Sequence, residues 1–200
     1  MPLATGLVLL LVGVSALLHT HPADVDDIVG WASTNLHNLG HHPVAAMFGS
    51  AFVIPDGLLP ELILVAVSVA LLERRIGTLR TAAILVSGHI IATLITELGL
   101  GLGIWLSRLP DSDLVRSDVG ISYVTYTALG ACTFFATGRW RFIAPAGLVG
   151  LAVLEFALSP GMTATGHLLS VGIGIAGMAI GHRRSVGMVA RRRSEAATPD

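Results

Sequence analysis

The chain has 200 residues, of which 53% are hydrophobic and 12% charged, and its formal net charge is −1. A soluble domain carries about 25% charged residues, so this composition excludes an ordinary soluble enzyme. The chain has no basic cluster of the kind that binds nucleic acid, and we expect no nucleic-acid partner. The single cysteine, Cys132, excludes a disulfide framework or a cysteine-based metal site within one chain.

Long apolar segments recur along the whole sequence. A helix needs about 17–25 apolar residues to cross roughly 30 Å of hydrocarbon. Six segments approach this length, at 3–19, 58–72, 81–106, 120–137, 142–158 and 163–180. The sequence therefore predicts an all-α membrane protein, with six transmembrane helices bundled in one domain over residues 1–182.

The arginines are distributed unevenly between the two sides of this predicted bundle. All twelve basic residues are arginine, which together with the many Ala, Gly, Leu and Val residues is typical of a GC-rich bacterial genome. Ten of them follow the second, fourth and sixth segments, and only Arg108 and Arg116 lie on the other side. This asymmetry predicts a multi-pass protein of the cell membrane with both termini in the cytoplasm. Residues 183–200 then form a basic cytoplasmic tail.

The segment 20–57 is predicted to be an external loop lying in the membrane interface. It carries aromatic residues such as Trp31 and Phe48, which favour the level of the lipid headgroups. Its histidines, His37, His41 and His42, have a spacing that is weak evidence for a metal site, and interfacial polar residues explain them equally well. We therefore expect neither a metal nor a cofactor.

Small and polar residues share faces on the fourth and sixth segments. Residues four apart lie on one side of a helix, so Ser122 and Tyr126 lie on the same face. The complete stripes are Ser122, Tyr126 and Gly130 in the fourth segment, and Gly166, Ser170 and Gly174 in the sixth. Such residues allow two membrane helices to approach closely, and His167 lies beside the second stripe.

A serine and a histidine on two close helices provide the nucleophile and the general base that nucleophilic catalysis requires. The imidazole takes the hydroxyl proton as the oxygen attacks a carbonyl and returns it to the leaving group. An ionisable residue inside a membrane span is a functional candidate by default. The alternative is that Ser122 bonds its own helix backbone and His167 a buried partner.

Several motifs resemble those of rhomboid intramembrane serine proteases. The stretch "GISYVTYTALG" is similar to their Gly-x-Ser-Gly signature with a tyrosine and a glycine at four-residue steps, and Gly120, Ser122, Tyr126 and Gly130 match. "GHLLSVGIG" resembles the sixth span, which opens with the catalytic histidine. "LLERRIGTLR" resembles the Glu-x-Arg-x-Gly stretch after the second span, and "HPVAAMFGSAF" the segment that leads into it.

The resemblance implies a Ser–His dyad without an acidic third member. Ser122 would be the nucleophile, His167 the general base, and Tyr126 would pack against the imidazole ring. The substrates would be transmembrane helices of other proteins, cleaved near the external surface without metal or cofactor.

The chain also departs from this pattern. The family's second span carries His-x-x-x-Asn, which feeds the oxyanion hole, but residues 44–88 contain neither His nor Asn, and Tyr123 replaces the glycine after the serine. The Trp-Arg pair common in the family's first loop is also missing. A possible substitute is His89, oriented by Glu97 on the same helix face.

Two further interpretations stay open at this stage. One is an inactive rhomboid-like pseudoprotease that binds transmembrane helices of client proteins. The other is a small transporter or channel subunit with a polar path through His89, Glu97, Glu61 and His167. A transporter is expected to contain an internal repeat, and the sequence shows none.

Overall fold

The computed structural model describes residues 1–54 and 58–195, with side chains as far as His182. Every regular element in these ranges is helical. Six helices form the body: α1 (Pro2–Thr20), α5 (Leu58–Ile76), α6 (Thr78–Trp105), α7 (Ser122–Cys132), α8 (Trp140–Leu158) and α9 (Met162–Glu195). The end of the predicted loop at 55–57 and the end of the predicted tail at 196–200 lie outside the described residues.

Four of these helices are long and apolar enough to cross a membrane, and six crossings therefore remain a prediction. Within the described residues, α1, α6, α8 and the first 21 residues of α9 satisfy both criteria. Helix α5 carries four charged residues near its ends, namely Glu61, Glu73, Arg74 and Arg75. Helix α7 has only 11 residues, or about 16 Å of rise, and is shorter than the predicted segment at 120–137.

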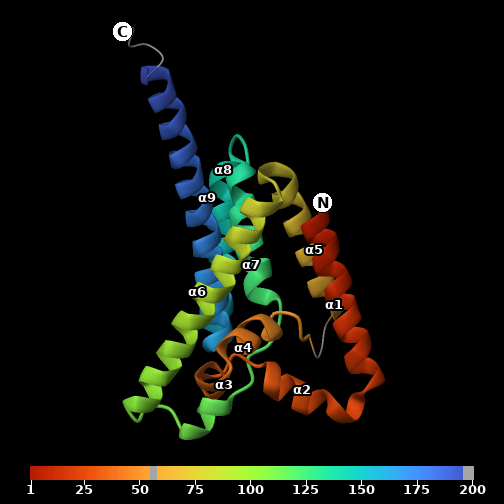
Figure 1. Cartoon of the computed structure of the whole chain (residues 1–200). Coiled ribbons are helices and arrows are strands. Elements are labelled where there is room, and N and C mark those ends of the chain that lie inside the picture. Colours follow the sequence, from red (N-terminus) through yellow and green to blue (C-terminus); the bar gives the residue numbers. More distant parts are fainter. Residues whose placement is uncertain (55–57, 196–200) are drawn as a thin grey trace.

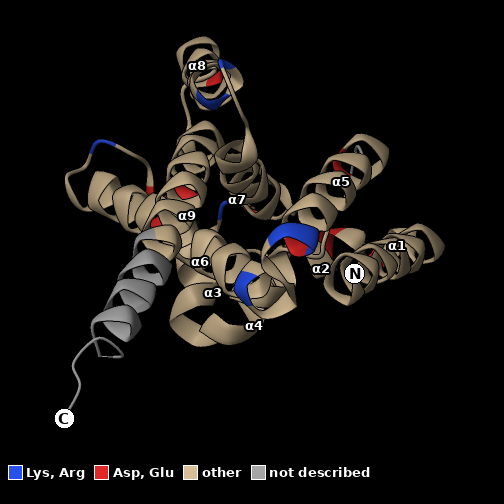
Figure 2. Cartoon of the chain, turned by 90° about the horizontal axis from the view of Figure 1, so that it is seen from above, with Lys and Arg blue, Asp and Glu red and all other residues tan. Residues whose placement is uncertain are grey.

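The start of α1 and the end of α9 lie at the same end of the bundle (Figure 1). Seen along the bundle, charged residues are sparse, and most of the ribbon carries neither sign (Figure 2). Termini on one side agree with an even number of crossings. The side of the membrane on which they lie remains a prediction from the arginine distribution.

The opposite end of the bundle is closed by short helices that the sequence interpretation treated as a loop (Figure 1). They are η1 (Pro22–Asp24), α2 (Val25–Ala32), α3 (Leu36–His41) and α4 (Pro43–Ser50). The buried amide of Asn38 donates to the carbonyls of Gly30 and Ser33 at 2.7 and 2.9 Å. The ring of His42 donates to the carbonyl of Trp31 at 3.1 Å. Side-chain bonds to backbone therefore hold this segment in a defined shape.

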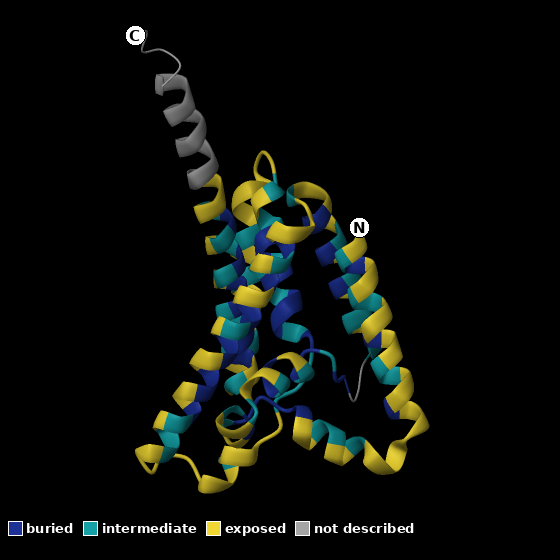
Figure 3. Ribbon diagram, viewed as in Figure 1, coloured by how far each residue is buried: buried dark blue, intermediate teal, exposed yellow. Residues whose placement is uncertain are grey.

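Helix α7 is the most enclosed helix, and the outer helices carry many exposed residues (Figure 3). On α1, α5 and α8, large residues such as Leu9, Leu71 and Leu151 are at least half exposed. Exposed leucines on this scale are expected where lipid, rather than water, covers the surface. Helix α7 packs most extensively against α9.

Glycines permit this close contact between α7 and α9. A Cβ on Gly174 would overlap the carbonyl oxygen of Thr127, and one on Gly130 would overlap the carbonyl oxygen of Val171. On Gly166 it would meet the ring of Tyr123. Because two of these neighbours are backbone atoms that side-chain motion cannot clear, any larger residue separates the helices.

The buried carboxylate of Glu73 caps the start of α1. It accepts hydrogen bonds from the backbone N–H groups of Leu3 and Ala4 at 3.0 and 2.9 Å, and from the Thr78 hydroxyl at 2.7 Å. The first N–H groups of a helix have no partner within the helix, and a negative charge there is favourable. Glu73, which is the acidic residue of "LLERRIGTLR", therefore ties α1 to the turn between α5 and α6.

Replacing Glu73 by glutamine is expected to lower the free energy of unfolding by about 1.5–3 kcal/mol, since bonds to a charged acceptor are lost and an amide group faces backbone donors. Thermal or denaturant unfolding of the purified protein in detergent measures the change. Arg74→Gln, at the exposed neighbouring position, is the matched control and is expected to have little effect. Equal stability of both variants would contradict the capping role.

Candidate active site

The chain enters α7 through an extended segment tied to the short helices. The N–H of Gly120 donates to the carbonyl of Ser50 at 2.7 Å, and the N–H of Thr34 donates to the carbonyl of Asp118 at 3.0 Å. The hydroxyl of Ser33 accepts from the N–H of Asp118 at 2.7 Å. Backbone groups of an irregular segment need hydrogen-bond partners where they are buried, and these bonds supply them.

Gly120 has a backbone role in this segment. Its φ of +131° lies in a region that glycine adopts readily and other residues do not. A Cβ at this position would meet no other atom within 4 Å. The glycine two residues before the serine is therefore needed for backbone conformation, whereas Gly130 and Gly174 are needed for close packing.

Ser122 is the first residue of α7 and lines a small polar cavity of about 130 Å³. His89, Asp118 and Thr163 line the same cavity. The half-buried Ser122 hydroxyl makes no hydrogen bond to the described residues. The N–H groups at the start of α7 point out of the helix N-terminus, which favours negative charge.

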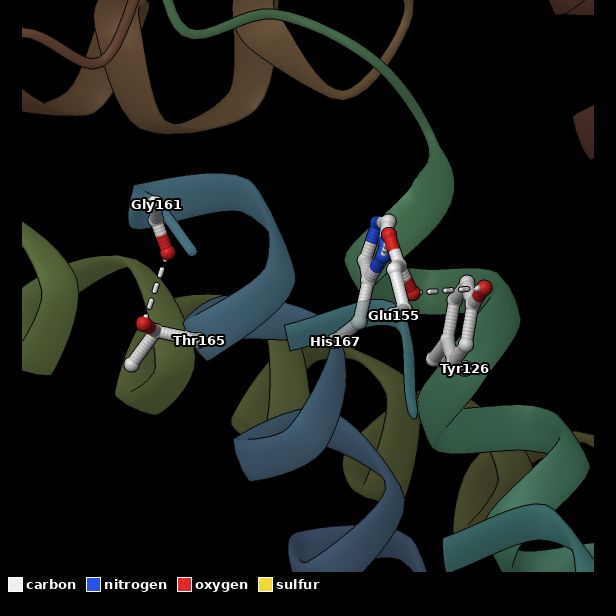
Figure 4. A network of polar contacts seen from close by, with 5 residues as sticks. All are labelled: Tyr126, Glu155, Gly161, Thr165 and His167. Carbon is white, nitrogen blue, oxygen red and sulfur yellow. Dashed lines mark hydrogen bonds and ion pairs between the residues drawn. The ribbon is translucent and has the colours of Figure 1, made fainter. Parts of the chain in front are cut away.

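The ring of His167 is held by two other helices (Figure 4). Its Nδ1 lies 2.8 Å from Oε1 of Glu155 on α8. The ring of Tyr126 on α7 stacks on the imidazole with centroids 4.0 Å apart and an angle of 7°. The opposite nitrogen, Nε2, is buried and has no hydrogen-bond partner among the described residues. Because Nδ1 faces a carboxylate, the neutral ring carries its proton there and leaves a lone pair on Nε2.

Ser122 and His167 are brought into neighbouring positions but are not hydrogen-bonded to each other. Tyr126, one turn after Ser122, contacts the imidazole, and Thr163, one turn before His167, lines the serine's cavity. The direct contact between the two groups therefore stays a prediction. It requires the hydroxyl to approach the unpartnered Nε2.

His89 is held differently from the arrangement that the sequence interpretation proposed. Its Nε2 donates to the carbonyl of Met47 at 2.7 Å. Glu97 is buried, and neither of its carboxylate oxygens has a hydrogen-bond partner in the described part of the chain, so Glu97 does not orient His89. A neutral His89 in this tautomer has only an acceptor at Nδ1 and cannot donate to an oxyanion.

Asp118 places a carboxyl group at the edge of the cavity. Burial raises the pKa of Asp118 above its ordinary value, although the hydroxyl of Thr34 and the charges of His167 and Arg116 act in the opposite direction. Because its pKa is raised, Asp118 becomes protonated at a higher pH than an exposed aspartate does. Once Asp118 is protonated, it no longer repels a negative charge that forms near Ser122.

Tyr123 replaces the small residue expected after the serine, and Gly166 provides the space for it. The Tyr123 ring is buried and lies edge-on to His167, with centroids 5.9 Å apart. A side chain on Gly166 would overlap that ring. The larger residue on α7 is thus matched by the smallest residue on α9.

The sequence interpretation did not identify Glu155. It is the only charged residue between positions 142 and 158, and an acidic residue inside an apolar span is the signal that identifies it. The resemblance implies a dyad without an acidic member, and Glu155 is therefore not part of the predicted site. The structure places its carboxylate against the imidazole.

Comparison with known protein families gives a match over most of the chain. A family model described as rhomboid-like protein matches residues 4–186. No curated protein and no solved structure matches the chain.

Proposed function

The chain belongs to the rhomboid-like protein family, and we propose that it is an intramembrane serine peptidase that acts through Ser122 and His167. It is a multi-pass membrane protein in contact with the lipid bilayer. Its substrates are membrane proteins, in which it hydrolyses a peptide bond. The reaction needs no cofactor.

One observation carries the proposal, namely the arrangement of the His167 ring. Stacking on Tyr126 and the contact with Glu155 fix its orientation, and the free Nε2 is the atom that a general base requires. The helix that carries His167 packs against the helix that begins with Ser122. Most buried polar atoms in proteins have a hydrogen-bond partner. His89, which lines the cavity beside Ser122, also has one unpartnered ring nitrogen, Nδ1, but only the His167 ring is oriented by both a carboxylate and a stacked aromatic ring.

The chemistry follows from these groups. Nε2 of His167 accepts the hydroxyl proton while Oγ of Ser122 attacks the carbonyl carbon of the substrate. The imidazolium then returns the proton to the leaving nitrogen as the C–N bond breaks. A water molecule, deprotonated by the same nitrogen, hydrolyses the acyl-enzyme and restores the hydroxyl.

The first N–H groups of α7 are our candidates for stabilising the oxyanion. They include the N–H of Ser122 itself, at the positive end of the helix dipole. Removal of one oxyanion donor from a serine hydrolase costs about 2.7–4 kcal/mol. We therefore expect a slow enzyme, because no His-x-x-x-Asn pair adds side-chain donors and neutral His89 cannot.

We further propose that both termini are cytoplasmic and that the protein lies in the plasma membrane. The ten arginines that follow the second, fourth and sixth predicted segments support this orientation. The cavity beside Ser122, near the short helices, then opens toward the external side.

A second candidate function is client binding without cleavage. It is favoured by the side-chain donors that are missing from the oxyanion site and by the buried Tyr123 ring in the place of a small residue. A pseudoprotease of this kind would use the same helix faces to hold a transmembrane segment of a client protein.

Labelling with a fluorophosphonate separates the two functions, since the probe forms a covalent bond only with an activated serine. The purified full chain in detergent is expected to become labelled at Ser122, as located by peptide mass spectrometry. Ser122→Ala is expected to remain unlabelled. A folded wild-type protein that takes up no label after prolonged exposure contradicts the peptidase proposal and favours client binding.

A further inference from the structure

We propose that Glu155 is a positioning residue that makes the Ser122–His167 pair a three-membered system. The inference rests on the proposed function. Its carboxylate lies 2.8 Å from Nδ1 of His167, within the range of a charge-assisted hydrogen bond. A carboxylate at this nitrogen orients the ring and stabilises the imidazolium that forms during the reaction.

The carboxylate itself is held in place. The hydroxyl of Tyr126 donates to Oε2 of Glu155 at 3.3 Å, while Oε1 faces the imidazole. The same tyrosine ring stacks on His167. Three side chains from α7, α8 and α9 thus form a closed set in which each contacts the other two (Figure 4).

This set determines which imidazole nitrogen is available. The Glu155 carboxylate accepts a hydrogen bond from Nδ1 and so keeps the ring proton on that nitrogen. The other nitrogen, Nε2, is left buried without a partner among the described residues. A base for Ser122 has to present this lone pair. Glu155 therefore selects the reactive tautomer as well as the ring orientation.

A purely structural role for Glu155 has a clear physical basis and has to be distinguished. Helix α8 buries little of its surface, with Ala152 as its only buried residue, and it packs mainly against α9. The bond from Glu155 to His167 also fastens these two helices. The Glu155 side chain is 35% exposed, so replacement by the isosteric glutamine is expected to leave the fold intact.

The tautomer of His167 distinguishes the two roles, because a contact that only fastens α8 to α9 is not expected to determine which ring nitrogen carries the proton. It is measured by ¹⁵N NMR of histidine-labelled full-length protein in the Ser122→Ala background, at a pH where the ring is neutral. The signal is assigned by its loss in His167→Ala. We expect a ring protonated at Nδ1, and a mixture of both tautomers once Glu155→Gln is added, because the glutamine amide can donate to Nδ1 as well as accept from it.

Fluorophosphonate labelling rates test the catalytic consequence. Glu155→Gln is expected to lower the rate by about 10²- to 10⁴-fold, since replacing a triad carboxylate by an amide costs up to about 10⁴-fold. Glu155→Asp keeps the charge and is expected to recover part of the loss. Tyr126→Phe removes only the bond to Oε2 and is expected to have a smaller effect. Asp26→Asn, an exposed acid on α2, is the control and is expected to label like the wild type.

The outcomes separate this inference from the proposed function. If the wild-type protein is not labelled, the peptidase proposal is wrong. A His167 tautomer that changes in Glu155→Gln still supports the positioning role in that case. A tautomer that is the same with glutamate and glutamine overturns the inference. If Glu155→Gln fails to fold, the labelling rates of Glu155→Asp and Tyr126→Phe test the inference instead. Wild-type rates in both variants overturn the positioning role of Glu155.

Discussion

Replacing His167 by alanine is expected to slow the labelling of Ser122 by at least about 100-fold. A positioned general base contributes about 10²–10⁴-fold to such a reaction, and Nε2 of His167 is buried without a hydrogen-bond partner among the described residues. The imidazole is enclosed by Tyr126 and Tyr123, so the truncation leaves a cavity that water can fill. Rates of fluorophosphonate labelling at several probe concentrations measure the effect.

His182→Ala is the matched control for this experiment. It removes an exposed imidazole about four turns further along the same helix, where the ring contacts Phe134. We expect it to label at the wild-type rate. Labelling of His167→Ala as fast as the wild type, with Ser122→Ala unlabelled, would show that another group takes the proton.

Gly174→Ala is expected to lower the free energy of unfolding by about 1–3 kcal/mol, the usual cost of overpacking. The added methyl group would overlap the carbonyl oxygen of Thr127 and lie 2.8 Å from the backbone nitrogen of Ala131. Both atoms belong to the backbone of α7, so relief requires the two helices to separate. Because α9 also carries His167, labelling of Ser122 is expected to slow as well.

Gly172→Ala adds the same methyl group to the same helix at a position where it meets no atom within 4 Å. It is expected to be neutral or to stabilise α9 by up to about 1 kcal/mol, since alanine favours a helix more than glycine does. Unfolding of both variants in detergent measures the contrast. A Gly174→Ala variant as stable as Gly172→Ala would refute the close packing of α7 and α9.

The class of the protein was predictable because hydropathy is a local property. The apolar segment 142–158 corresponds to α8 (Trp140–Leu158), and 81–106 corresponds to α6 (Thr78–Trp105). Lipid leaves the backbone no partner other than itself, so a predominantly apolar run of this length has to form a helix. The all-helical fold and the rhomboid-like family are confirmed.

The start of the fourth helix was not predictable in the same way. The segment 120–137 has the composition of a full membrane span, yet α7 begins at Ser122 and ends at Cys132. Its beginning depends on the backbone conformation of Gly120 and on bonds to Ser50 and Thr34, whose partners Gly120 and Asp118 lie 70 and 84 residues further along the chain. A hydropathy pattern contains no information about partners so far away in the chain.

The sequence alone determines the membrane class, most helix ranges, and the serine and histidine candidates. Each of these depends on composition or on spacing within one helix. The tertiary structure alone decided that Glu155 contacts His167, that Met47 rather than Glu97 holds His89, and that short helices close one end of the bundle. Each of these contacts joins different helices, and the direction of a side chain between helices is set by packing, which only the folded chain defines.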